Sequence, residues 1–107
     1  MAQIVAVSED LLLGSKVEAM LSAAGHEVTL SAALAGAPLD EAEVVVVDLD
    51  TESPEALVGL GMPVLGYYSH VDVETKEAAE AAGIDKVVPR SRMARELPDL
   101  VKGLLDV

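Results

Sequence analysis

Short apolar runs and segments with a helical period alternate along this chain. The strongest run is Val44–Val47, four consecutive valines that are followed by Asp48 and, two residues later, by Asp50. Successive β-branched residues suit a strand that is covered on both faces, as in the centre of a parallel sheet. We therefore expect a central strand here, with both carboxylates at its carboxyl end.

Four other segments also have the composition of strands. Each is short, contains aliphatic or β-branched residues and is bounded by turn residues. The second of them alternates apolar and polar positions, which is typical of a half-exposed edge strand. The four segments are residues 4–7, 26–31, 63–68 and 86–88.

A helix is predicted over residues 11–24, because the apolar positions recur with a helical period and Gly25 supplies a C-terminal stop. The connection that comes after the second strand, residues 31–42, contains Gly36 and Pro38. Both residues disfavour the interior of a helix, so any helix in this connection should be short or broken.

Capping residues predict two helices in the second half of the chain. Ser53 precedes Pro54, which is favourable at the first position of a helix, so we expect a helix that continues to Leu60. Asp72 is expected to cap an alanine-rich helix that ends at Gly83.

The last helical region should begin at Ser91. Pro98 is expected to interrupt it, because proline has no N–H to donate inside a helix. We therefore expect one turn that ends at Glu96 and a second helix from Pro98 to about Leu105.

Five strands joined by helices predict a flavodoxin-like, doubly wound α/β fold, with a five-stranded parallel sheet in a three-layer α/β/α arrangement and a single domain over residues 1–107. The glycine-rich turn of dinucleotide-binding folds is absent, since Ser8-Glu9-Asp10 follows the first strand. The strand order 2-1-3-4-5 would instead bring Glu9 and Asp10 beside Asp48.

Composition narrows the classes of function. Cysteine is absent, which excludes disulfides, thiol catalysis and cysteine-based zinc sites. No apolar run reaches the roughly 20 residues that span a membrane, and the N-terminus lacks the pattern of a signal peptide. We therefore expect a cytoplasmic protein that has no membrane partner.

The net charge of −12 comes entirely from the first part of the chain. Residues 1–75 contain thirteen acidic residues and one basic residue, whereas residues 76–107 contain six of each. Nucleic-acid phosphates are bound through Lys and Arg, so we expect no nucleic-acid partner. The acidic excess suits solubility, with a cation-binding pocket as the alternative.

The sequence resembles the receiver domain of response regulators, the CheY-like family, over nearly its whole length. In that family an acidic pair follows the first strand and a phosphoacceptor aspartate ends the third. A Ser or Thr ends the fourth strand, and a Lys-Pro pair ends the fifth. The matching positions here are Ser8-Glu9, Asp48, Tyr68 or Ser69, and Pro89-Arg90.

This resemblance implies a phosphoacceptor at Asp48. It also implies a Mg²⁺ site, because hard cations take oxygen ligands. The candidate metal ligands are Glu9, Asp10 and Asp48. The candidate pocket rim consists of Ser8, Asp50, Ser69, His70 and Arg90. A candidate face for a protein partner, either a kinase or an effector, consists of Lys86, Arg92 and Arg95.

Three departures from the family pattern affect this chemistry. Ser8 replaces the first acid of the pair, and Val87 stands where the family has an aromatic switch residue. Pro89 replaces the lysine that contacts the phosphoryl group, which leaves Arg90 beside it. Glu9 and Asp10 also suit a simpler role as favourable charges at the start of a helix.

Three hypotheses follow. The favoured one is a pseudo-receiver, a non-enzymatic signalling module that acts by protein–protein interaction without standard phosphoryl transfer. The second is an active single-domain response regulator that is phosphorylated on Asp48 with Mg²⁺. The third is a small-molecule or nucleotide binder on a flavodoxin-like fold.

Overall fold

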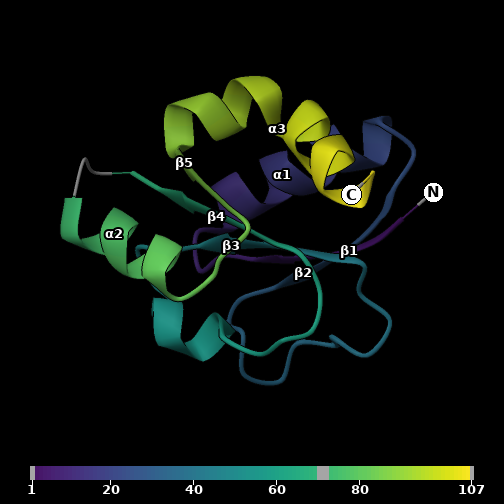
Figure 1. Ribbon diagram of the computed structural model, residues 1–107. Coiled ribbons are helices and arrows are strands. Elements are labelled where there is room, and N and C mark those ends of the chain that lie inside the picture. Colours follow the sequence, from purple (N-terminus) through teal and green to yellow (C-terminus); the bar gives the residue numbers. More distant parts are fainter. Residues whose placement is uncertain (1, 70–72, 107) are drawn as a thin grey trace.

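The computed structural model describes residues 2–69 and 73–106, and its strands form a parallel sheet in the order β2-β1-β3-β4-β5 (Figure 1). The strands are β1 (Gln3–Val7), β2 (Glu27–Ser31), β3 (Val44–Asp48), β4 (Val64–Tyr68) and β5 (Lys86–Pro89). The five predicted strands and their predicted order are therefore confirmed, and no strand end differs from its prediction by more than one residue.

Helices cover both faces of the sheet (Figure 1). α1 (Leu11–Ala23) and α3 (Arg90–Leu105) lie together on one face. The opposite face carries α2 (Val73–Ala81) and the 3-10 helix η1 (Pro54–Leu57). The predicted three-layer arrangement is confirmed. Among the described residues, no helix has both the length and the apolar character that crossing a bilayer requires.

β3 holds the two halves of the hydrophobic core together. All five of its residues are buried, and strand geometry directs successive side chains to opposite faces. Val44 and Val46 pack in the cluster under α1 and α3, whereas Val45 and Val47 pack in the cluster under α2 and η1. The valine run is therefore the doubly covered central strand that the sequence predicts.

Local sequence fixes both ends of α1. The carboxylate of Asp10 accepts hydrogen bonds from the N–H groups of Leu12 and Leu13, at 3.0 and 3.2 Å. These are two of the donors that the start of a helix leaves without intrahelical partners. Gly25 follows the helix with φ of +95°, a backbone conformation that glycine adopts without steric cost.

The connections after β2 and β3 contain less helix than the receiver-like frame suggests. Residues 32–43 form turns and bends without a helix, as the Gly and Pro in that segment favour. The helix predicted from 54 to 60 is only the four-residue η1, and Ser53 makes no side-chain capping hydrogen bond. Gly59 and Gly61 have positive φ, so the backbone leaves the helical conformation directly after η1.

The alanine-rich helix forms as α2 and is followed by Gly83, whose φ of +85° marks the predicted stop. Asp72, which was expected to cap this helix, lies outside the described residues.

The expected break in the last helix is wrong, because α3 continues through Pro98. Its buried side chains form one stripe on one side of the helix, as in an amphipathic helix. They are Met93, Leu97, Leu100 and Val101. Burying four such side chains stabilises the helix by more than the roughly 3 kcal/mol that an internal proline costs. Ser91 lies inside the first turn, after Pro89 at the N-cap position.

We predict that Gly66→Ala will destabilise the fold by about 1–3 kcal/mol, because adding a methyl group to a packed core displaces its neighbours. A Cβ at Gly66 would lie 2.7 Å from Cδ1 and 2.9 Å from Cγ of Leu49, which is buried. Chemical denaturation measures the loss. The double variant with Leu49→Ala should lose less stability than the sum of the single variants, and additive losses would contradict this contact.

Candidate functional site

The parallel pairing of β1 with β3 brings the predicted acidic segments together. Val7 is the register partner of Val47, so the residues that follow β1 lie beside the end of β3. Two polar side chains are buried here, Ser8 at 1% and Asp48 at 7% exposure. We call Ser8, Asp10, Asp48, Tyr67 and Arg90 the carboxyl-end site.

Asp48 ends β3 and anchors the turn that follows it. One carboxylate oxygen, Oδ1, accepts a hydrogen bond from the N–H of Asp50 at 2.8 Å. The backbone carbonyl of Asp48 accepts hydrogen bonds from the N–H groups of Thr51 and Glu52, at 3.3 and 3.1 Å. The carboxylate is therefore held in place by the backbone of its own loop.

Burial raises the pKa of Asp48 above the ordinary value of 3.8. The hydrogen bond from Asp50 opposes this shift, whereas the negative charge of Asp50 adds to it. Arg90 lowers the pKa and Asp10 raises it, by smaller amounts. Ionised Asp48 therefore costs the folded state free energy, because desolvation outweighs the attraction of the nearby cation.

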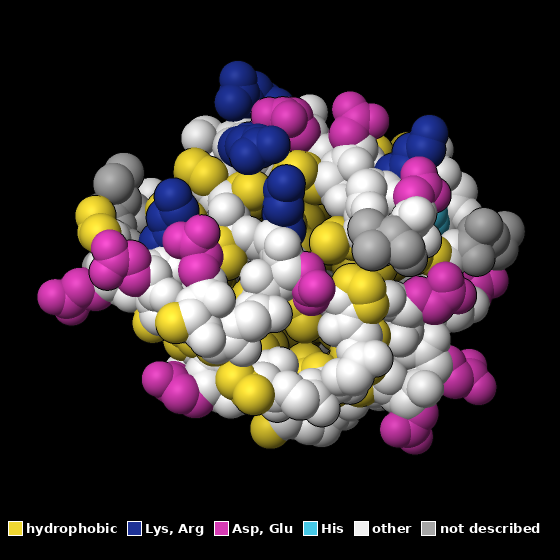
Figure 2. All heavy atoms as spheres, viewed as in Figure 1, with side chains coloured by type: hydrophobic (Ala, Val, Ile, Leu, Met, Phe, Trp, Pro, Cys, Tyr) yellow, Lys and Arg dark blue, Asp and Glu magenta, His cyan; other side chains and the backbone are white. Residues whose placement is uncertain are grey.

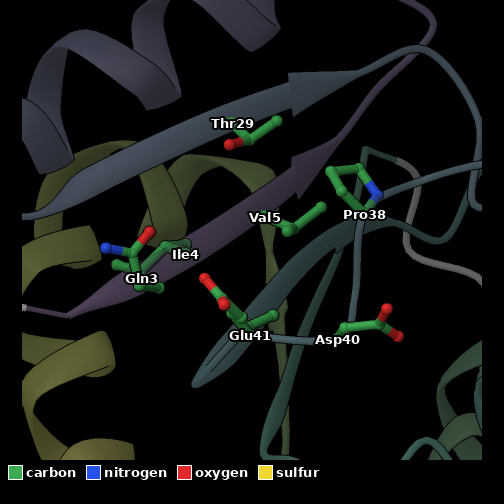
Figure 3. Close-up of a pocket in the computed structure, with 8 residues that line it drawn as sticks. Gln3, Ile4, Val5, Thr29, Pro38, Asp40 and Glu41 are labelled. Carbon is green, nitrogen blue, oxygen red and sulfur yellow. The ribbon is translucent and has the colours of Figure 1, made fainter.

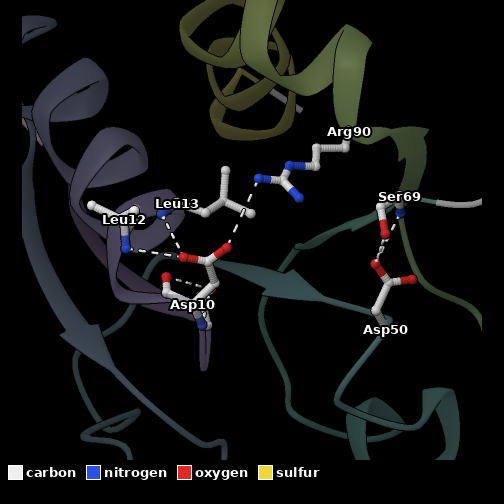
Figure 4. A network of polar contacts seen from close by, with 7 residues as sticks. Asp10, Leu12, Leu13, Asp50, Ser69 and Arg90 are labelled. Carbon is white, nitrogen blue, oxygen red and sulfur yellow. Dashed lines mark hydrogen bonds and ion pairs between the residues drawn. The ribbon is translucent and has the colours of Figure 1, made fainter.

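Asp10 lies between the helix start and Arg90 (Figure 4). One of its oxygens caps α1, and the other lies 3.9 Å from Nη2 of Arg90. The two side chains are 48% and 46% exposed, so this ion pair is partly solvated. The arrangement supports the simpler role that the sequence suggests for Asp10, as a capping charge. It also shows that the side chain of Arg90 points toward the site.

Ser8 links the site to a buried phenol. Its hydroxyl donates to the carbonyl oxygen of Asp10 at 3.1 Å and also bonds Tyr67, which is the register partner of Asp48 on β4. Burial raises the pKa of Tyr67 to about 12, although the hydrogen bond with Ser8 lowers it. The alternation at the end of β4 predicts that Tyr67 and Tyr68 point to opposite sides, and they pack in opposite clusters. It did not indicate which of the two reaches the site.

Asp50 connects the loop after β3 to the end of β4 (Figure 4). Its Oδ2 accepts a hydrogen bond from the backbone N–H of Ser69 at 3.0 Å and another from the hydroxyl of Ser69. Ser69 is exposed directly after β4, whereas Tyr68 is buried under α2 and η1. The hydroxyl at this edge is thus engaged by Asp50 and does not contact Asp48.

Glu9 and His70 are the remaining residues of the predicted metal site and pocket rim. Glu9 is exposed, and His70 lies outside the described residues. Over residues 2–69 and 73–106, no group of three or more His, Asp or Glu side chains could hold a metal ion. Mg²⁺ requires near-octahedral oxygen ligands. Both oxygens of Asp10 and Oδ1 of Asp48 instead meet N–H groups or a guanidinium, so the described side chains form no ready-made cluster of oxygen ligands.

The residues of the predicted partner face are divided between two places. Arg92 and Arg95 lie on the first turns of α3 and both contact Glu96, at 3.3 and 4.0 Å. Lys86 lies at the amino end of β5, beside a groove that also includes Asp99. Figure 2 shows Lys and Arg side chains over α3 and toward α2, whereas Asp and Glu predominate around the lower rim of this view.

Comparisons with known sequences do not assign a family. A scan against protein-family models found no match. A search of curated proteins likewise found no match.

Comparisons with solved structures give long, consistent alignments. A response-regulator receiver domain from Clostridium thermocellum aligns with a TM-score of 0.84 and 14% identity, covering 99% of this chain and 95% of that one. The chemotaxis protein CheY4 from Vibrio cholerae aligns with a TM-score of 0.80 and 20% identity, covering 98% and 99%. A protein from Burkholderia thailandensis, described as a candidate pilus assembly protein (CpaE), aligns with a TM-score of 0.81 and 20% identity over 100% of both chains.

Identities this low establish the fold, and function must then be argued from the site. The flavodoxin-like topology of this chain and the order of its strands are those of response-regulator receiver domains, the CheY-like fold.

Proposed function

We propose that this chain is a pseudo-receiver, a signalling module that acts through protein–protein contacts and lacks the standard phosphoryl-transfer chemistry. One observation carries the proposal: three of the four carboxylate oxygens of Asp10 and Asp48 already have partners within the protein. Asp10 caps α1 and faces Arg90, while Asp48 accepts the N–H of Asp50.

Phosphorylation of a buried aspartate adds negative charge to a site that must offset it. A divalent cation does so by coordinating both the carboxylate and the phosphoryl oxygens. In this chain a permanently charged guanidinium stands beside Asp10, and it cannot coordinate as a metal does. Ser8 contributes a hydroxyl where the family pattern has a carboxylate, and Ser69 donates its hydroxyl to Asp50.

The likeness to CpaE supports a role based on binding. That neighbour is described as a pilus assembly protein and not as a signalling protein, although it shares the fold over its full length. The fold therefore occurs in a protein whose description does not involve phosphorylation. A module that keeps the scaffold and uses its surface is consistent with this pattern.

The exposed arginines on α3 are the proposed partner face, by analogy with receivers. Arg95 is 73% exposed, and Arg92 and Arg95 share a single carboxylate, that of Glu96. The patch therefore keeps positive charge in a chain that is strongly acidic overall. An acidic surface on a partner protein would complement it and speed the encounter.

We expect no phosphorylation when the protein is incubated with Mg²⁺ and acetyl phosphate. Intact-mass spectrometry should show no adduct of about 80 Da, and beryllofluoride with Mg²⁺ should cause no shift in amide resonances near Asp48. A receiver domain with the complete family pattern serves as the positive control. An adduct that disappears in Asp48→Asn would overturn the proposal in favour of an active response regulator.

The difference in stability between Asp48→Asn and the parent protein should depend on pH. The pKa of Asp48 is raised in the folded state. Ionisation of Asp48 therefore lowers the free energy of unfolding at pH values above the unfolded pKa, near 3.8, and has no effect on it at lower pH. The variant should therefore be more stable than the parent at pH 7, and the difference should shrink as the pH falls toward 4. Denaturation at several pH values measures it, with Glu55→Gln as the control. A difference that does not vary with pH would contradict the desolvation of Asp48.

Reversing the charge of the partner face should weaken partner capture. We expect Arg92→Glu/Arg95→Glu to reduce the recovered partner by about tenfold or more, because like charges across an interface repel. Affinity capture from cells that express the chain, followed by quantitative mass spectrometry, gives the readout. Lys16→Glu/Lys102→Glu makes the same charge change elsewhere and should retain capture. Equal recovery with all three proteins would exclude this face.

A further inference from the structure

β2 forms one edge of the sheet, and one side of its backbone has no partner. The N–H of Glu27 and the carbonyl oxygen of Ser31 each form a 2.9 Å hydrogen bond with a residue that flanks β1. Because backbone groups point to alternate sides along a strand, the N–H and carbonyl groups of Val28 and Leu30 point away from the sheet. In the part of the chain that the structure describes, no segment forms a hydrogen bond with these outward groups. β2 therefore presents an open row of backbone donors and acceptors.

The other edge strand, β5, has two features that protect an edge. It begins with Lys86 and ends with Pro89, and both residues are exposed. A lysine charge and a residue without an N–H both disfavour the addition of a further strand. β2 contains neither residue type, and its pairing with β1 is continuous from Glu27 to Ser31, without a bulge. Of the two edges, β2 is therefore the one that can accept another strand.

The two faces of β2 differ in how they are covered. Thr29 is exposed on the face that carries α2 and η1, where a cavity of about 310 Å³ lies between β2 and the crossover of residues 32–43 (Figure 3). On the opposite face, Val28 and Leu30 pack partly against the core under α1. Leu30 lies against the helix itself, since its Cδ1 is 2.7 Å from the place of a Cβ on Gly14. A strand beside β2 would therefore meet an apolar face next to α1 and a polar face beside the cavity.

β2 is complementary to a second copy of itself. A two-fold axis at Thr29 would align two β2 strands antiparallel and place Val28 opposite Leu30 of the second copy. Because both residues present outward groups, each such pair would exchange both of its N–H···O=C hydrogen bonds. An axis at Val28 or Leu30 would instead pair an outward residue with position 26 or 32, which lies outside the strand. The axis at Thr29 therefore satisfies every outward group of β2.

The same register places no like charges opposite one another. Glu27 is the only charged residue in β2, and it would lie opposite Ser31 of the second copy. The two Glu27 side chains would be about 13 Å apart along the strands, beyond the screening length at physiological salt. At the axis Thr29 would meet Thr29 of the second copy, and threonine pairs are favourable across strands. The acidic charge of the whole chain opposes association, but salt screens it.

We propose that this chain forms a dimer in which β2 pairs antiparallel with β2 of a second copy, about a two-fold axis at Thr29. The two sheets then join into one. Each copy uses its single unprotected edge, so the contact closes on itself and adds no further copies. Two short strands bury less area than a permanent interface, so the dimer exchanges with monomers. The proposal is independent of the pseudo-receiver role, since β2 contributes no residue to the carboxyl-end site.

Disulfide trapping tests the axis directly, because the chain has no cysteine and Thr29→Cys adds a single thiol. Facing residues of this kind have Cα atoms about 4.5 Å apart, which a disulfide can span. Thiols in a formed dimer react at their effective concentration, so Thr29→Cys should cross-link roughly tenfold faster or more than Ser53→Cys, an exposed control at the start of η1. Non-reducing electrophoresis after mild oxidation gives the rates. Equal rates would overturn the proposal.

Charges placed at the axis give a second test. Thr29→Glu and Thr29→Lys each put like charges opposite one another, so each variant alone should sediment as a monomer. An equimolar mixture brings opposite charges together and should dimerise more strongly than the parent. Sedimentation velocity at physiological salt, up to about 1 mM protein, covers dissociation constants of weak complexes. A parent that stays monomeric throughout, or a mixture that dimerises less than the parent, would contradict pairing at Thr29.

The backbone bonds are tested by Val28→Pro. This change removes an outward N–H and no bond to β1, and proline is tolerated on an edge strand in that orientation. The variant should lose dimerisation while circular dichroism shows that it remains folded. Dimerisation at the parent's strength in folded Val28→Pro would place the interface elsewhere. These variants leave the carboxyl-end site unchanged, so their outcome is separate from that of the phosphorylation experiment.

Discussion

The parallel pairing of β1 with β3 is the constraint on which the rest of the structure depends. β3 is buried on both faces and pairs with β1 on one side and with β4 on the other. Because strands in a parallel sheet all end at the same edge, this pairing brings residues more than thirty positions apart to one place. The hydrophobic core and the carboxyl-end site are thus consequences of the same strand. Moving its register by one residue would exchange the two faces of the core and turn Asp48 away.

Negative charge at this edge is balanced by donors that the protein itself provides. The N–H groups at the start of α1 and the guanidinium of Arg90 meet Asp10, and the N–H of Asp50 meets Asp48. Such interactions are fixed in the fold, whereas a bound cation depends on its concentration and on the exchange of water ligands. This distinction separates a scaffold with a receiver's topology from a receiver that responds to phosphorylation. Under the proposed function, the fold is kept while its usual phosphoryl-transfer chemistry is lost.

The two faces of the sheet differ in how completely they are covered. α1 and α3 pack side by side over one face, whereas the other has α2, a short 3-10 helix and a crossover without helix. Less coverage exposes β2 and opens the cavity beside Thr29. This chain therefore departs from the receiver pattern in two separate regions, the carboxyl-end site and the crossover between β2 and β3. Both regions also contribute to the core, because Tyr67 packs under α1 and α3, and Leu34, Leu39 and Ala42 of the crossover pack against the opposite cluster.

The sequence alone determined the strands and the boundaries of α1, since these depend on side-chain alternation and on caps that act within a few residues. The strand order was predicted from the acidic residues that follow the first and third strands. It also named Asp10, Asp48 and Arg90 as candidate site residues, and the sheet brings them to one edge. Local signals could not show that α3 would pass through Pro98, because the buried stripe that outweighs the proline exists only against the sheet. Nor could they pair Asp10 with Arg90, Asp50 with Ser69 or Ser8 with Tyr67. These contacts join residues that are far apart in the chain, and only the register and packing of the folded sheet decide which of them meet.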